Sequence, residues 1–205
     1  MHMKRLFAFT LALALTLSLA AGAASGAGGQ FSGPTKDNFL KVLHSKAAFI
    51  MKDVEQEGVK NKGKLMFLKN VLNDGEDSRT IEQFTVFDLD GDGAPEVLLE
   101  LSMNGDRLVF HFEKGEIYGF MIPYRGMTDL KRDGSADGSG GADDSSISKF
   151  QFKDGTCKYV DTIQNPGAAV WEKQGKKENV EWYPYSQDTF DADFAKAWKN
   201  TPPRQ

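Results

Sequence analysis

The sequence predicts an α+β fold: a mostly antiparallel, twisted sheet of about six to eight strands, with two N-terminal helices and one C-terminal helix packed on it. Two observations predict the sheet. Short segments rich in β-branched and aromatic residues recur between residues 81 and 163, and Gly-containing turns separate them. A third observation predicts the helices, because leucines near the N-terminal end and aromatic residues near the C-terminal end recur at helical spacing.

Residues 1–23 have the order of a secretory signal peptide. Lys4 and Arg5 precede an apolar run at 6–20, and small residues follow, with Ala-x-Ala at Ala21–Ala23 as a candidate cleavage site. The apolar run is short for a membrane span, so a retained anchor is the less favoured alternative and no span is expected after its removal. We predict a secreted, periplasmic or extracellular protein, with a flexible leader at 24–36 and a single domain at 37–205.

The N-terminal part of that domain contains the two predicted helices. Thr35 or Asp37 is suited to cap a helix that starts at about Asn38. Leu65–Leu72 carries leucines at i, i+3 and i+7 and predicts the second helix. Between them, Ala47–Lys52 is compatible with either a helical turn or a short strand.

The strands follow from residue 81 onward. Glu113–Gly115 and Asp154–Gly155 are suited to hairpin turns, because Gly adopts a positive φ at low cost. The predicted strands are Ile81–Phe87, Val97–Leu101, Arg107–Phe112, Glu116–Ile122, Ile147–Phe152 and Thr156–Ile163.

The C-terminal part predicts one more pair of strands and the last helix. Ala168–Glu172 is expected to pair with Asn179–Tyr183 across a basic, Gly-containing turn. A helix over Thr189–Lys199 places Phe190, Phe194 and Trp198 on one face, which should dock on the sheet.

The acidic stretch between the first two strands is the one candidate chemical site. Asp88, Asp90 and Asp92 alternate with small residues, Gly93 follows, and Glu96 completes the set. Carboxylates this close repel one another unless a cation lies among them, and Ca²⁺ takes six to eight oxygen ligands at about 2.3–2.6 Å. A backbone carbonyl at Ala94 would add a further ligand. The alternative is an acidic hairpin without a metal.

The loop is not an EF-hand. An EF-hand needs a bidentate Glu at the twelfth position and helices on both sides, but Leu99 holds that position and both flanks predict strands. Pro95 suits the residue just before a strand and not the interior of a helix.

The run Asp88-x-Asp90-x-Asp92-Gly93-x-x-Glu96 resembles the calcium-binding turn of FG-GAP/VCBS-type repeats, which also occurs singly in uncharacterised exported bacterial proteins. The resemblance covers about 15 residues, and since this chain holds the motif once, it does not imply a propeller. It implies that Asp88, Asp90, Asp92 and Glu96, with the Ala94 carbonyl, are Ca²⁺ ligands.

The weaker signals each have a structural explanation. Asp133–Asp144 is rich in Gly and Asp and predicts a solvated hairpin loop, with a ligand-binding loop as the alternative. An open groove beside this segment would favour the alternative. The aromatic residues Tyr118, Tyr124, Trp171, Trp182, Tyr183 and Tyr185 suit a glycan-stacking surface as well as a core. Cys157, the only cysteine, is expected to be a buried thiol, and His111 a half-buried strand residue.

Charge and composition narrow the function. After removal of residues 1–23, 23 basic and 29 acidic residues remain, a net charge of −6, which argues against nucleic acid as the main partner. We therefore predict an exported, non-enzymatic calcium-binding module whose ion holds the 84–101 hairpin. A binding or adhesion module for glycan or for a cell-envelope protein is the alternative, and a hydrolase with an unrecognised site is a further one.

Overall fold

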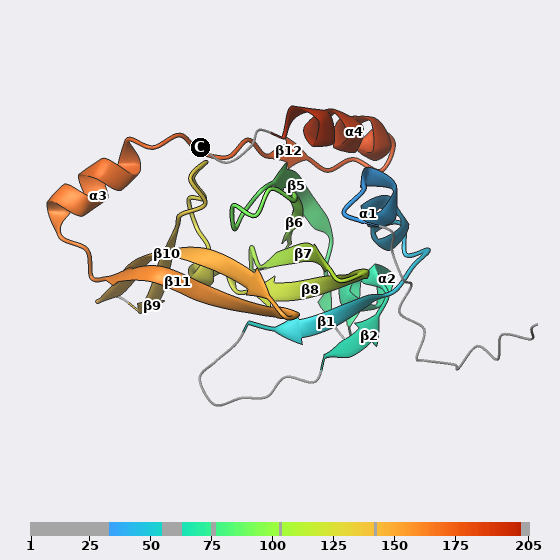
Figure 1. The fold of residues 1–205 in the computed structure, drawn as a ribbon, viewed down its shortest axis with the longest axis horizontal. Coiled ribbons are helices and arrows are strands. Elements are labelled where there is room, and N and C mark those ends of the chain that lie inside the picture. Colours follow the sequence, from blue (N-terminus) through green and yellow to red (C-terminus); the bar gives the residue numbers. More distant parts are fainter. Residues whose placement is uncertain (1–32, 55–62, 75–76, 103, 142, 202–205) are drawn as a thin grey trace, which may run out of the picture.

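The computed structural model describes residues 33–54, 63–74, 77–102, 104–141 and 143–201. The predicted signal peptide and most of the leader lie outside this part of the chain. The described elements form an α+β arrangement, in which helices cover one face of a large sheet and a smaller sheet covers the other (Figure 1). The α+β prediction is confirmed at this level, and several of its details are wrong.

The large sheet has seven strands in the order β12-β5-β6-β7-β8-β1-β2. Every neighbouring pair is antiparallel except β1 and β8, which run parallel. The strands are β1 (Phe49–Asp53), β2 (Lys64–Met66), β5 (Ile81–Phe87), β6 (Glu96–Leu101), β7 (Arg107–Glu113), β8 (Glu116–Ile122) and β12 (Tyr183–Pro184).

A separate sheet holds the predicted hairpin of residues 147–163. Its order is β11-β10-β9, with strands β9 (Ala136–Gly141), β10 (Asp144–Lys153) and β11 (Thr156–Gln164). The prediction of a solvated loop at Asp133–Asp144 is therefore wrong, because most of it pairs with β10 as β9. The smallest sheet joins β3 (Asn73–Asp74) to β4 (Asp77–Ser78).

The helices are α1 (Lys36–Leu43), α2 (Leu68–Leu72), α3 (Ala168–Gly175) and α4 (Phe190–Asn200), with a 3-10 turn, η1, at Tyr124–Gly126. The second helix is shorter than predicted, because Lys64–Met66 pairs with β1 as β2. The predicted strand at Ala168–Glu172 is wrong. This segment is rich in good helix formers and forms α3.

Two hydrophobic cores lie on opposite faces of the large sheet. On one face α1, α2 and α4 cover Phe84, Leu99 and Phe110. On the other face the β9–β11 sheet places Phe150 and Phe152 against Leu98 and other inward side chains. The C-terminal helix lies against this face, where Phe190 and Phe194 of α4 both contact the ring of Phe84.

The β7–β8 hairpin is hydrogen-bonded to the turn of the β10–β11 hairpin. Lys114 and Gly115 join β7 to β8, Asp154 and Gly155 join β10 to β11, and all four residues have positive φ, as the tightest hairpin turns require. The Glu113 carboxylate accepts hydrogen bonds from the backbone N–H groups of Asp154 (3.0 Å) and Gly155 (2.6 Å). These contacts fix the smaller sheet over β7, beside the acidic loop.

Candidate metal centre

The acidic loop, residues 88–95, joins β5 to β6 at the end where Phe87 pairs with Glu96. Gly91 has φ +81° and Gly93 has φ +90°, so both occupy the region that favours glycine. A side chain of ordinary type at Gly93 would strain the turn, which explains why Gly follows Asp92. The prediction that strands flank this loop on both sides is confirmed.

The aspartates of the loop bind its backbone. Asp88 accepts hydrogen bonds from the N–H groups of Gly91 (2.8 Å) and Gly93 (3.2 Å) through its two carboxylate oxygens. Asp90 accepts from Asp92 at 3.1 Å, and Asp92 accepts from Ala94 at 2.7 Å. These bonds close the loop around its acidic side chains, and each bonded oxygen retains a second lone pair for a cation.

Three of the predicted ligands converge. One carboxylate oxygen from each of Asp88, Asp90 and Glu96 lies within 4.8 Å of the other two. Asp88 is 5 % exposed and Glu96 is fully buried. Oxygen ligands at about 2.3–2.6 Å from one ion lie at most about 5 Å apart, so the three side chains are close enough to share a cation.

Asp92 stands apart from this group of side chains. Asp92 is exposed, and the cluster found among the described residues does not include it. Its carboxylate caps the N–H of Ala94 and thereby shapes the turn. That Asp92 and the Ala94 carbonyl are ligands stays a prediction.

Glu96 is fully buried and is held by two hydrogen bonds. Its Oε2 accepts from the N–H of Leu89 (2.7 Å), and its Oε1 lies 2.9 Å from Nδ1 of His111. Burial raises the pKa of Glu96 to about 7, despite the opposing effect of His111. A charge in this position therefore needs a positive partner, which either His111 or a cation supplies.

His111 is the residue that sequence reasoning missed. It is buried, not half-buried, and its ring stacks on Phe152 of β10 with centroids 4.8 Å apart. Burial lowers the pKa of His111, but the hydrogen bond and charge of Glu96 outweigh that effect and leave the pKa raised. No local sequence signal pointed to this contact, because it depends on the register in which Val97 of β6 pairs with Phe110 of β7.

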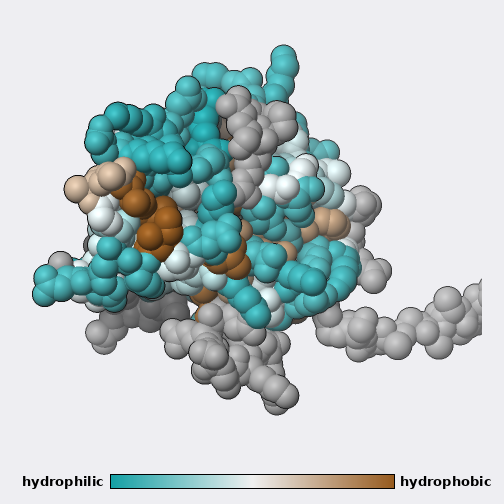
Figure 2. All heavy atoms as spheres, turned by 60° about the vertical axis from the view of Figure 1, so that its left-hand side comes forward, coloured by the Kyte–Doolittle hydropathy of each residue, from teal (hydrophilic) through white to brown (hydrophobic). Residues whose placement is uncertain are grey.

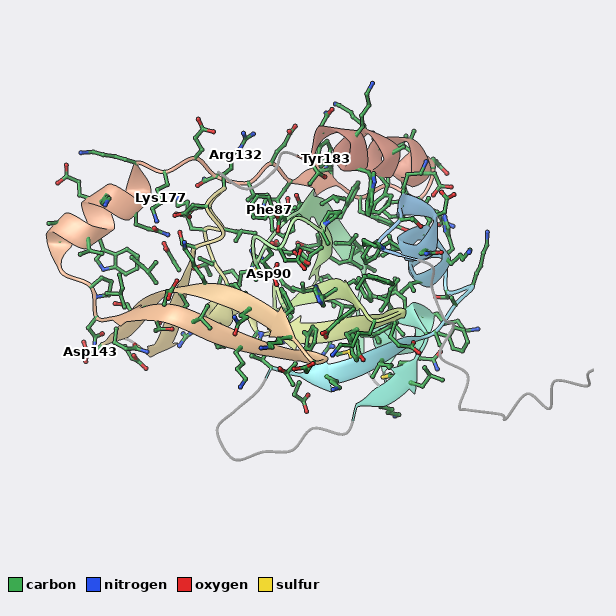
Figure 3. All side chains as sticks on the ribbon, viewed as in Figure 1. Phe87, Asp90, Arg132, Asp143, Lys177 and Tyr183 are labelled. Atoms are coloured by element: carbon green, nitrogen blue, oxygen red, sulfur yellow. The ribbon has the colours of Figure 1, made fainter. Side chains whose placement is uncertain are left out.

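The centre lies between the two sheets. Asp90 is labelled in Figure 3, where it lies close to β10, and its Oδ2 accepts a hydrogen bond from the N–H of Phe152 at 3.3 Å. Burial, with the nearby charge of Asp92, raises the pKa of Asp90. The loop thus contacts both the strands that carry it and the sheet packed above.

The other predicted candidates are placed elsewhere. Cys157 is a buried thiol, as expected, and burial raises its pKa. Tyr183 stacks on Phe84 in the helix-covered core, whereas Tyr118 and Trp182 pack against the core between the sheets. Tyr124 lies over the guanidinium of Arg107. These aromatic residues are divided between different layers.

Comparisons with family models, with curated proteins and with solved structures each found no match. The likeness of the acidic loop to FG-GAP/VCBS turns therefore remains a local resemblance. Among the described residues, no helix has both the length and the apolar character needed to cross a membrane.

Proposed function

We propose that the protein is an exported calcium-binding module in which the ion is structural. The observation that carries the proposal is the convergence of Asp88 and Asp90 of the acidic loop with Glu96 at the start of β6, with one oxygen of each within 4.8 Å of the others. The donor set is all oxygen and acidic, which suits a hard divalent cation and not a soft metal such as Cu(I).

The ion would act where the layers meet. Asp88 belongs to the loop, Glu96 begins β6, and Asp90 contacts the backbone of β10. A cation held by these three side chains would cross-link the β5–β6 hairpin to the smaller sheet and offset the repulsion among the carboxylates. Since the unfolded chain cannot present the three groups together, the binding free energy would add to folding stability.

Calcium is favoured over magnesium by the character of the loop. Mg²⁺ demands near-octahedral geometry and keeps several waters, whereas Ca²⁺ accepts flexible carboxylate and carbonyl ligands. Asp88 and Glu96 are both buried, so an ion between them would exchange part of its water shell for carboxylate oxygens, which Mg²⁺ does reluctantly.

Isothermal titration calorimetry on chelator-treated protein tests the proposal. We expect heat with Ca²⁺, a weaker or absent response to Mg²⁺, and a melting temperature that rises with Ca²⁺. At a free ion concentration of about 100 times Kd the stability gain should be about 2.7 kcal/mol. No heat with Ca²⁺, together with a melting curve that excess chelator leaves unchanged, would refute the proposal.

A further inference from the structure

The face of the β9–β11 sheet that turns toward the large sheet changes character along its length. At one end Phe150 and Phe152 of β10 are buried in the core between the sheets. Farther along the same face of β10, Ser146 pairs with Gly138 of β9 and with Gln164 of β11. Toward the end of the sheet near α3, this face therefore carries serine, glutamine and glycine in place of phenylalanine.

A groove of about 370 Å³ occupies this polar end. Pro123, Arg125 and Gly126, which follow β8, line it together with residues of all three strands. Its volume lies within the roughly 300–1,000 Å³ of small-molecule sites. Figure 2 turns this end of the molecule forward and shows a surface that is mainly hydrophilic.

Two glycines lie in close contact with side chains that line the groove. A Cβ on Gly138 would lie 2.8 Å from Oγ of Ser146, and one on Gly126 would lie 2.5 Å from the hydroxyl oxygen of Tyr159. Real Cβ atoms do not approach other atoms this closely, so larger residues would displace the groove's own lining. Gly138 and Gly126 therefore allow the close approach of Ser146 and Tyr159 to the backbone at this groove.

Three hydroxyl groups of the groove are bonded within the protein, since Ser139 donates to the Gly141 carbonyl and Ser148 bonds Thr162, but four other polar side chains in the described part of the chain are not. Among the described residues, no hydrogen bond or ion pair joins the side chains of Arg125, Asp144, Ser146 or Gln164 to another group. The neighbouring polar side chains differ, because Ser135 and Gln174 are hydrogen-bonded to each other and to nearby aspartates. There Ser135 donates to Asp133 at 2.6 Å, and Gln174 donates to Asp137 at 3.0 Å.

The free groups define the ligand class. One cation and one anion balance each other, and an amide and a hydroxyl add donors and acceptors of both kinds, which favours a neutral, multiply hydroxylated molecule over an ion. Tyr159 adds an aromatic ring that packs on Phe150 at 5.2 Å yet is 39 % exposed. Such a ring offers a firm apolar surface to the C–H face of a sugar.

We propose that this groove is a binding site for a neutral saccharide. Tyr159 provides the apolar wall, while Arg125, Asp144, Ser146 and Gln164 bind hydroxyl groups. The site uses none of the acidic-loop residues, so it does not rest on the proposed calcium function. The aromatic residues singled out from the sequence are not those that line this groove; Tyr159 takes that place.

Protein-observed NMR tests the proposal on the purified chain in the presence of Ca²⁺. The probes are cellopentaose, maltopentaose and chitopentaose, with a heparin oligosaccharide as the anionic probe. We expect at least one neutral probe to shift the amide signals of Gly138, Gly140, Ser146 and Gln164. Shifts confined to other regions, binding of the anionic probe alone, or no response to any neutral probe would each overturn the proposal.

Two variants and a matched control locate the site. Gln164→Ala removes one free amide and should weaken binding of the responding saccharide about tenfold. Ser146→Trp fills the groove and should abolish binding. Gln151→Ala is the control, because Gln151 lies on the opposite face of the same sheet, outside the groove. Equal affinity of the Gln164→Ala variant and the control, at unchanged melting temperature, would contradict the assignment.

Discussion

Glu96 of β6 and His111 of β7 form a hydrogen-bonded pair across two neighbouring strands, with Oε1 and Nδ1 2.9 Å apart and both side chains almost completely buried. The ring of His111 is itself held by stacking on Phe152. His111 therefore fixes the orientation of Glu96, so that the second carboxylate oxygen faces the N–H of Leu89 in the acidic loop.

Loss of His111 should be costly. His111→Ala leaves the buried Glu96 carboxylate without its partner, and we expect a loss of about 3–5 kcal/mol in the free energy of unfolding without calcium. Urea denaturation measures this loss, which should shrink in excess Ca²⁺. The control is His44→Ala, because His44 pairs with Asp191 at an exposed site and should cost at most about 1 kcal/mol. Similar costs for the two variants would contradict the role of the buried pair.

The effect of Asp90→Asn on the melting temperature should depend on calcium. The amide can accept only one of the two hydrogen bonds that Asp90 accepts, from Asp92 and Phe152, but it also removes one charge from the cluster. Because the relief of charge repulsion offsets the lost bond, the variant in chelator should melt no lower than the parent protein. In excess Ca²⁺ only the parent protein should gain stability. Differential scanning calorimetry in chelator and in excess Ca²⁺ measures the melting temperatures of both proteins. Asp188→Asn removes an exposed carboxylate outside the loop and should behave like the parent protein in both.

Gly119 should tolerate no side chain. A Cβ at this position in β8 would lie 2.5 Å from the ring of Phe49 in the parallel strand β1. Gly119→Ala should therefore cost about 1–3 kcal/mol by overpacking, measured by urea denaturation. The matched change Gly175→Ala, at the end of α3 where no atom lies within 4 Å, should be neutral or stabilise by up to about 1 kcal/mol. Equal effects would show that β1 does not press on β8.

Asp133 should make the protein sensitive to acid. Burial raises its pKa, but hydrogen bonds from Lys177 and Ser135 outweigh that effect and bring it down to about 2. A depressed carboxyl pKa stabilises the folded state above the unfolded pKa, and this contribution is lost as the pH falls from about 4 toward 2. Asp133→Asn should flatten this part of the stability profile, measured by urea unfolding at a series of pH values. If the free energy of unfolding of the variant falls with pH as steeply as that of the parent protein, the Asp133–Lys177 pair does not contribute to stability.

Local features of the fold were predictable from the sequence. The turns at Lys114–Gly115 and Asp154–Gly155 depend on residues that adopt positive φ, and the strands on either side follow from their alternation. The spacing of Asp88, Asp90 and Glu96 indicated a cluster, and Thr35 accepts the capping hydrogen bond from Asn38 at 3.3 Å. Each of these signals lies within about ten residues of chain.

Long-range pairing was not predictable in the same way. Nothing near Phe49 indicates a parallel partner at β8, and nothing near Phe150 indicates a second sheet, because both depend on which distant apolar face is available. The contact of His111 with Glu96 depends on the register of β6 against β7. The groove beside β9–β11 needs three strands and η1 together, so its lining could not be predicted from any one segment.

The contact of α1 with α4 also sets the order in which the protein can form. Phe39, near the start of the described chain, packs on Trp198, near its end, with ring centroids 5.6 Å apart. Until the last eleven-residue helix has left the ribosome, the rings of Phe84 and Phe39 lack their cover. Completion of this layer must therefore follow synthesis of α4, and the rings beneath it stay uncovered in the nascent chain until then.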